Sequence, residues 1–72
     1  MNATATTFRH IPEHIWPTWY NGMTRKEYIY NDGQSVLEVH DYFRSRHPGA
    51  FVIKVEKCTV SGISAFCATI YN

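Results

Sequence analysis

The sequence has few of the features that mark extracellular, membrane or metal-binding proteins. It contains two cysteines, Cys58 and Cys67, among 72 residues, too few for the disulfide framework of small secreted domains. No apolar run approaches the roughly 20 residues of a membrane span, and the polar start MNATATTFRH lacks the apolar region of a signal peptide. These absences predict a cytoplasmic protein with reduced thiols and no membrane contact.

Charge and motif content narrow the function classes further. Lysine and arginine together number 7 and the carboxylates 6, so the net charge is +1. This balance argues against a strongly basic nucleic-acid binder and a strongly acidic DNA mimic, and leaves local basic patches open. The sequence lacks a nucleophile elbow, a P-loop and a His-Glu-x-x-His motif. We therefore expect no cofactor.

Aromatic residues, in contrast, are plentiful. The chain is expected to form a single domain over residues 1–72, and a domain this small buries only about 60% of its unfolded surface. It carries 4 phenylalanines, 5 tyrosines and 2 tryptophans, and each ring buries roughly 150–250 Å². These rings predict a core that forms without metal or disulfides.

Three of the large rings lie in the stretch HIWPTWYNGM, residues 14–23. Because proline and glycine interrupt it, we predict an irregular segment with one or two short helical turns. Trp16 is expected in the core, and Trp19 or Tyr20 near the surface.

The clearest predicted element is a helix over residues 36–46. Ser35 and Glu38 have the spacing of a capping box, and Pro48-Gly49 ends the helix. The predicted apolar face has helical spacing and consists of Val36, Val39, His40 and Phe43.

A β-hairpin is predicted to follow, turning on Ser61-Gly62. Alternation places Phe51, Ile53 and Val55 on an inner face. The predicted register sets Val55 opposite Ala68, Ile53 opposite Ile70, Cys58 opposite Ala65 and Glu56 opposite Cys67.

Two further strands are predicted before the helix. Residues 4–11 favour an edge strand that Pro12 ends. Residues 24–30 favour a strand, although Thr24 and Glu27 also fit a short capped helix. The sum is an α+β fold of ββαββ type, with one helix on a three- to four-stranded, largely antiparallel sheet. The helix covers one sheet face, so the aromatic segment covers the other or leaves it partly bare.

Candidate chemical sites are weak. His10, His14, Cys58 and Cys67 do not have zinc-motif spacing, so we expect buried thiols and no metal site. His40 and Asp41 point apart on a helix, and a small ribonuclease using His40 or His47 is the least favoured alternative. Arg25, Lys26, Arg44 and Arg46 form one patch if the second strand packs beside the helix end. With Tyr28 or Tyr30, this patch supports the alternative of a small nucleic-acid-binding regulatory module.

The run GQSVLEVHDYFRSRHPGAFVIKVEKCTVSGISAFCATIY, residues 33–71, resembles small phage-encoded anti-CRISPR proteins that act on type I systems. The likeness lies in a capped helix, a Pro-Gly stop and a Ser-Gly hairpin, a plan that small phage inhibitors of host polymerase share. The resemblance implies stoichiometric binding to a subunit of an RNA-guided surveillance complex, which blocks DNA recognition or nuclease recruitment. No family residue transfers to this sequence.

The leading hypothesis is therefore a non-enzymatic, phage-encoded inhibitor that binds a bacterial protein complex, possibly a Cas subunit. Aromatic and arginine side chains dominate binding energy at protein interfaces. The predicted contact residues are Trp16, Trp19, Tyr20, Arg25, Lys26, Tyr28, Tyr30, Arg44 and Arg46.

Overall fold

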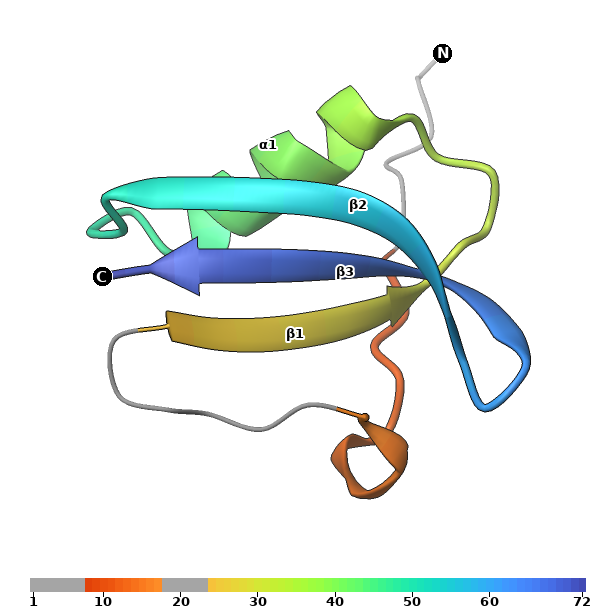
Figure 1. Ribbon diagram of the computed structural model, residues 1–72. Coiled ribbons are helices and arrows are strands. Elements are labelled where there is room, and N and C mark those ends of the chain that lie inside the picture. The colour runs from red at the N-terminus through yellow and green to blue at the C-terminus, as the bar shows by residue number, and fades with distance from the viewer. Residues whose placement is uncertain (1–7, 18–23) are drawn as a thin grey trace, which may run out of the picture.

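The computed structural model describes residues 8–17 and 24–72, which form one α-helix packed on a three-stranded antiparallel sheet (Figure 1). The strand order is β1-β3-β2, so the last strand lies in the middle. The elements in chain order are a 3-10 turn η1 (Glu13–Ile15), β1 (Thr24–Tyr30), α1 (Val36–Arg46), β2 (Val52–Val60) and β3 (Ile63–Tyr71). The predicted α+β class is confirmed.

Helix α1 has the bounds that its caps predict. The backbone N–H of Glu38 donates to Ser35 Oγ at 3.1 Å, and the N–H of Ser35 donates to Glu38 Oε1 at 2.9 Å. This capping box satisfies donors that the first turn otherwise leaves unpaired. Val39 and Phe43 of the predicted apolar face are fully buried, whereas Val36, predicted on the same face, is 42% exposed in the first turn.

The hairpin of β2 and β3 has the predicted register throughout, including Ile53 opposite Ile70 and Val55 opposite Ala68. Ser61 and Gly62 occupy the turn with φ values of +51° and +79°. Two successive positive φ angles match the right-handed twist of the flanking strands, which explains why this two-residue loop closes the hairpin.

Phe51 is the main error in the predicted hairpin. It lies in a bend before β2, and its side chain is 82% exposed instead of facing the core. The alternation that holds from Val52 onward does not extend back through this bend, which follows the Pro48-Gly49 stop. The N–H of Phe51 still donates to the carbonyl of Tyr71 at 2.7 Å, which fixes the bend against the end of β3.

Residues 24–30 form a strand, as preferred over a short helix, and β1 pairs with β3. The edge strand predicted over residues 4–11 is reduced, within the described residues, to one bridge between His10 and Ile29. Two backbone hydrogen bonds hold it: Ile11 N–H to the Tyr28 carbonyl at 3.1 Å, and Tyr30 N–H to the Arg9 carbonyl at 2.9 Å. Residues 4–7 lie outside the described part of the chain.

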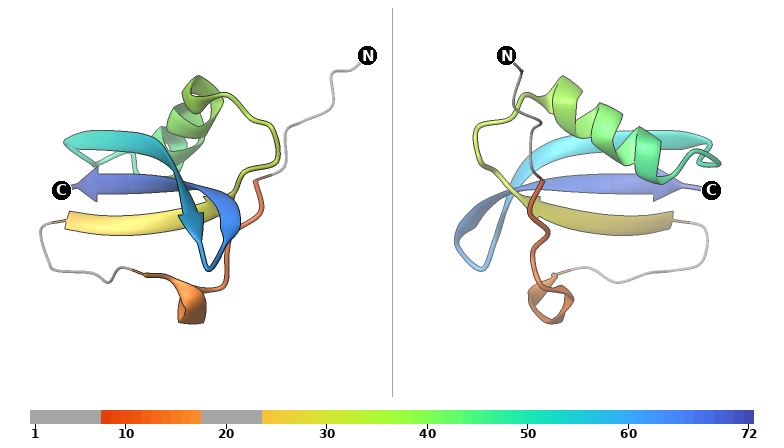
Figure 2. Two further views of the ribbon diagram at one scale, coloured as in Figure 1. Left: turned by 45° about the vertical axis from the view of Figure 1, so that its right-hand side comes forward. Right: turned by 180° about the vertical axis from the view of Figure 1, so that it is seen from behind.

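The core has one cluster on each face of the sheet. Figure 2 shows α1 lying across the back of the sheet, over one face. Under the helix lie Ile29, Val39, Phe43, Ala50, Ile53, Phe66, Ala68 and Ile70. The opposite face buries Ile11, Tyr28, Val60, Ala65 and Cys67, with Ile15 and Trp16 packed against them. The segment around Trp16 therefore covers one end of the second face, as one of the two alternatives predicted.

In the part of the chain that the structure describes, no helix has the length and apolar character needed to cross a membrane.

Candidate functional site

The four predicted cations do not share one face of the sheet. Because strand residues alternate, Arg25 points to the helix side, together with Glu27 and Ile29, while Lys26 points to the opposite side. Arg25 Nε lies 3.4 Å from Glu27 Oε2.

The two helix arginines lie on different flanks of α1. Arg44 Nη1 donates to the carbonyl of Ala50 at 2.8 Å, which ties the helix to the chain entering β2. Arg46 lies on the other flank, with its guanidinium 5.6 Å from the centre of the Tyr42 ring. The nucleic-acid module, which needs the cations and stacking rings on one platform, stays a prediction.

Two of the predicted contact residues contribute to the core instead of the surface. Tyr28 is 4% exposed, and Trp16 packs edge-to-face on it with ring centres 5.5 Å apart. Trp16 Nε1 donates to the carbonyl of Ile11 at 2.7 Å, so the indole is both packed and hydrogen-bonded. Trp16 thus lies against the core, as predicted. Trp19 and Tyr20 fall outside the described residues.

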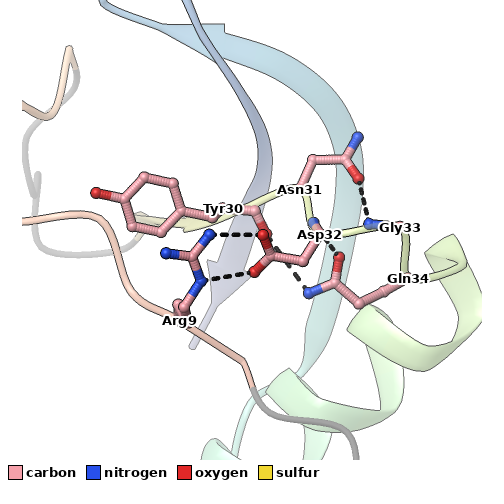
Figure 3. Close-up of polar contacts among 6 residues, drawn as sticks. All are labelled: Arg9, Tyr30, Asn31, Asp32, Gly33 and Gln34. Atoms are coloured by element: carbon pink, nitrogen blue, oxygen red, sulfur yellow. Dashed lines mark hydrogen bonds and ion pairs between the residues drawn. The ribbon is translucent and has the colours of Figure 1, made fainter.

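Tyr30 belongs to an exposed polar cluster that holds the amino-terminal segment on β1 (Figure 3). The Arg9 guanidinium lies 4.4 Å from the centre of the Tyr30 ring. It also donates to both carboxylate oxygens of Asp32, at 2.9 and 2.6 Å. The hydrogen bond from Arg9 lowers the pKa of Asp32.

The loop after β1 is ordered by its own side chains. The N–H of Asp32 donates to Gln34 Oε1 at 2.7 Å, and the N–H of Gly33 donates to Asn31 Oδ1 at 3.1 Å (Figure 3). Gly33 has φ +93°, a conformation that favours glycine. This cluster is a structural clamp, and its arginine and carboxylate are already paired with each other.

A second aromatic group lies on the flank of α1 that faces β1. Phe8 stacks on Tyr42 with ring centres 4.2 Å apart, and His10 Nε2 hydrogen-bonds Tyr42 Oη. Partial burial lowers the pKa of His10, and the nearby charge of Arg46 lowers it further. An open hollow of about 350 Å³ beside these rings is lined by Phe8, Glu38, Asp41, Tyr42 and Ser45.

Sequence reasoning missed a buried carboxylate beneath the helix end. Glu27 has a side chain only 4% exposed, and its Oε2 lies 2.9 Å from Nε2 of His47, without hydrogen-bond geometry. Removing one partner of such a pair leaves a buried polar group uncompensated. His47 Nε2 is itself buried, whereas a general acid or base must reach a substrate. The Glu27–His47 pair therefore belongs to the helix–sheet interface. The ribonuclease alternative stays a prediction.

The two thiols lie on the face opposite the helix. Cys67 is buried and Cys58 partly buried, and both are free. Burial raises the pKa of the Cys58 thiol, and proximity to Cys67 raises it further. Among residues 8–17 and 24–72, no three histidines, cysteines or carboxylates are placed to hold a metal ion.

Among the described residues, the most exposed large apolar side chain, Phe51, lies at the end of the sheet where β2 begins and β3 ends. Phe51 is 82% exposed, Val52 44% and Tyr71 40%. Val52 and Tyr71 are paired across the two strands. We name Phe51, Val52 and Tyr71 the terminal patch. Sequence reasoning missed it because strict alternation placed Phe51 inside, and the bend before β2 has no strong sequence signal beyond Pro48-Gly49.

Comparison with known proteins gives no relative. No family model matches the chain. No curated protein and no solved structure matches it either.

Proposed function

We propose that this protein is a non-enzymatic inhibitor that binds a partner protein stoichiometrically through the terminal patch. The observation that carries the proposal is the exposure of Phe51. A 72-residue chain has little apolar surface to spare, yet it leaves Phe51 exposed next to Val52 in the chain, with its backbone hydrogen-bonded to Tyr71. Exposed apolar side chains that are contiguous, unlike scattered ones, mark interaction surfaces.

The chemistry of the patch fits a protein partner. Two of its three side chains are aromatic, and aromatic residues supply much of the binding energy at interfaces. Lys54 follows Val52 on the same face of β2, and Lys26 lies on that face of β1, so cations border the apolar centre. An apolar centre with a charged rim is the usual anatomy of a protein–protein interface.

The order of elements over residues 33–71 supports a specific first target. Its likeness to small phage inhibitors of type I CRISPR systems directs the test to the bacterial cytoplasm and to surveillance complexes there. Inhibition by occupancy requires no reacting group.

The test is capture from a bacterial lysate that contains a type I surveillance complex. Wild-type protein is compared with Phe51→Thr and with Ile63→Thr, a control at the far end of β3 whose side chain is 36% exposed. We expect wild type and Ile63→Thr to retain the same protein complex near one-to-one stoichiometry, and Phe51→Thr to lose it. Equal capture by Phe51→Thr would remove the terminal patch from the proposal, and absence of any stoichiometric partner would overturn the function.

A further inference from the structure

Strand β2 forms an open edge of the sheet. In the order β1-β3-β2, the outer edge of β1 is hydrogen-bonded by residues 9–11, whereas β2 pairs only with β3 among the described residues. β2 is nine residues long and contains no proline or glycine, and its pairing with β3 runs without a bulge from Val52 to Val60. Natural edge strands are protected from pairing by shortening, bulges, interruption or charged side chains. β2 is not shortened, bulged or interrupted, and its protection consists of the charged residues Lys54, Glu56 and Lys57.

The direction of the free backbone groups follows from one hydrogen bond. The N–H of Asn31 donates to the carbonyl of Ser64. The backbone N–H and C=O groups of even-numbered β3 residues therefore point toward β1, and those of odd-numbered residues point toward β2. The β2 residues that pair with odd-numbered β3 residues, such as Glu56 opposite Cys67, are even-numbered, and their backbone groups bond to β3. The N–H and C=O groups of Ile53, Val55, Lys57 and Thr59 therefore point away from the sheet. We call this row of outward groups the β2 edge.

The flank of α1 next to the β2 edge is apolar at its start. Tyr42 faces Phe8 and His10 on the β1 side, so helical geometry places His40 and Arg44 on the flank next to β2, with Val36 at its start, whereas Leu37 points mainly outward. The contact from Arg44 to the Ala50 carbonyl agrees with this orientation, and Figure 2 shows α1 lying over β2. Leu37 is 72% exposed and Val36 42%.

The charge beside the β2 edge is mainly positive. Lys57 is exposed on the helix side of the strand, where Arg44 also lies on the helix flank. Lys54 is exposed on the other face, which it shares with Glu56. None of these three forms an ion pair within residues 8–17 and 24–72, and Glu56 is the one carboxylate on β2. Unpaired cations of this kind favour an acidic occupant.

We propose that the β2 edge accepts an extended segment of the partner protein as an added strand, in which apolar and acidic side chains alternate. The inference rests on the proposed function, because it specifies how the partner is held. Main-chain hydrogen bonds from residues 53, 55, 57 and 59 supply affinity, and alternate side chains supply specificity. Acidic side chains of the segment lie on the helix side toward Lys57 and Arg44, and apolar ones lie on the other face beside Val52 and Cys58.

The first test uses amide hydrogen exchange by NMR with a defined probe, the peptide acetyl-(Val-Glu)₃-amide. In the free protein we expect fast exchange at Ile53, Val55, Lys57 and Thr59, and slow exchange at the even-numbered amides that bond to β3. Slow exchange at the odd-numbered amides of the free protein, as pairing with a second copy would give, would overturn the inference.

Addition of the probe is expected to shift and protect the odd-numbered amides saturably. The matched peptide acetyl-(Val-Lys)₃-amide is expected to bind at least about tenfold more weakly, because its charge opposes Lys57 and Arg44. Equal binding of the two peptides would contradict the acidic assignment, and no shift with millimolar probe would contradict the added strand.

The second test removes one outward amide. Lys57→Pro deletes a donor that β3 does not use, at an edge position where proline is tolerated. The control Lys57→Ala removes the side chain and keeps the amide, and Thr59→Pro with Thr59→Ala is a second pair if Lys57→Pro fails to fold. We expect the proline variants to lose the probe and the captured partner, and the alanine variants to keep both.

These outcomes separate the two proposals. Capture that survives in folded Lys57→Pro but is lost in Phe51→Thr would overturn the added strand and leave the proposed function standing. Capture that is unaffected in Phe51→Thr, with probe binding that depends on the Lys57 amide, would remove the terminal patch and leave the added strand standing.

Discussion

At the scale of single residues, the guanidinium of Arg9 stabilises the ionised carboxylate of Asp32. Its nitrogens Nη2 and Nε donate to the two carboxylate oxygens at 2.6 and 2.9 Å. The hydrogen bond lowers the pKa of Asp32, so its contribution to stability is present above the unfolded-state pKa, about 3.9. That contribution is lost as pH falls through the lower folded-state value. We expect carboxyl NMR titration to give an Asp32 pKa below its usual value in wild type and an ordinary one in Arg9→Gln. An unshifted wild-type pKa would show that the ion pair does not persist in solution.

His10 predicts a second, separate pH effect. Partial burial and the charge of Arg46 lower its pKa, so folding favours the neutral ring. The stability that depends on a neutral His10 is present above the unfolded-state pKa, about 6.5. It is lost as pH falls toward the folded-state value. Between about pH 7 and 5 we expect the unfolding free energy of wild type to fall more than that of His10→Gln. Parallel pH profiles for the two proteins would contradict the burial of the ring.

At the scale of elements, the capping box predicts how α1 responds to loss of one hydroxyl. Ser35→Ala removes the acceptor for the Glu38 N–H, and we expect a loss of about 1 kcal/mol in urea unfolding. Ser45→Ala is the matched control, because Ser45 is exposed near the other end of the helix. It should be neutral or slightly stabilising, since alanine is the better helix former. A Ser35→Ala protein as stable as wild type would show that the cap is unimportant.

Two glycines, Gly62 in the hairpin turn and Gly49 after the helix, allow a similar comparison. Gly62 has φ +79°, whereas Gly49 does not have a positive φ, and an added Cβ meets no atom within 4 Å at either position. Backbone strain alone therefore distinguishes them. We expect Gly62→Ala to destabilise by about 1 kcal/mol and Gly49→Ala to stabilise by about 0.4–1 kcal/mol, through the entropy of the unfolded chain. Thermal unfolding of both variants measures the difference, and the reverse order would refute the turn conformation.

The elements were predictable where the signal is local. A capping box and a Pro-Gly stop lie within a few residues of the helix that they bound. Once Ser61 and Gly62 are placed in a two-residue turn, the residues on either side pair in order, which sets the hairpin register. Phe51 was not predictable in the same way, because alternation does not show where a strand begins. The chain bends there, and the ring is left 82% exposed.

At the scale of the whole molecule, the site was less predictable than the elements. Strand order decides which surfaces are open, and the insertion of β3 between β1 and β2 joins residues far apart in the sequence. The contact of Glu27 with His47 depends on the strand order and on how α1 crosses the sheet. The residues around Glu27 and around His47 carry no sequence pattern that predicts this order or this crossing. Conversely, Tyr28 and Trp16 are aromatic residues of the kind that dominate interfaces, yet they cover the sheet face opposite the single helix of the described residues.

The central claim is that the terminal patch binds a partner protein, and its most direct test is the affinity of the captured partner, once purified. Isothermal titration compares wild type, Phe51→Thr and Ile63→Thr, with urea unfolding as the control for folding. Because Phe51 makes little contact within the protein, we expect Phe51→Thr to unfold within about 0.5 kcal/mol of wild type. Its affinity should fall about 30-fold or more, while Ile63→Thr stays within about threefold at one-to-one stoichiometry. A folded Phe51→Thr protein that binds as tightly as wild type would contradict the claim.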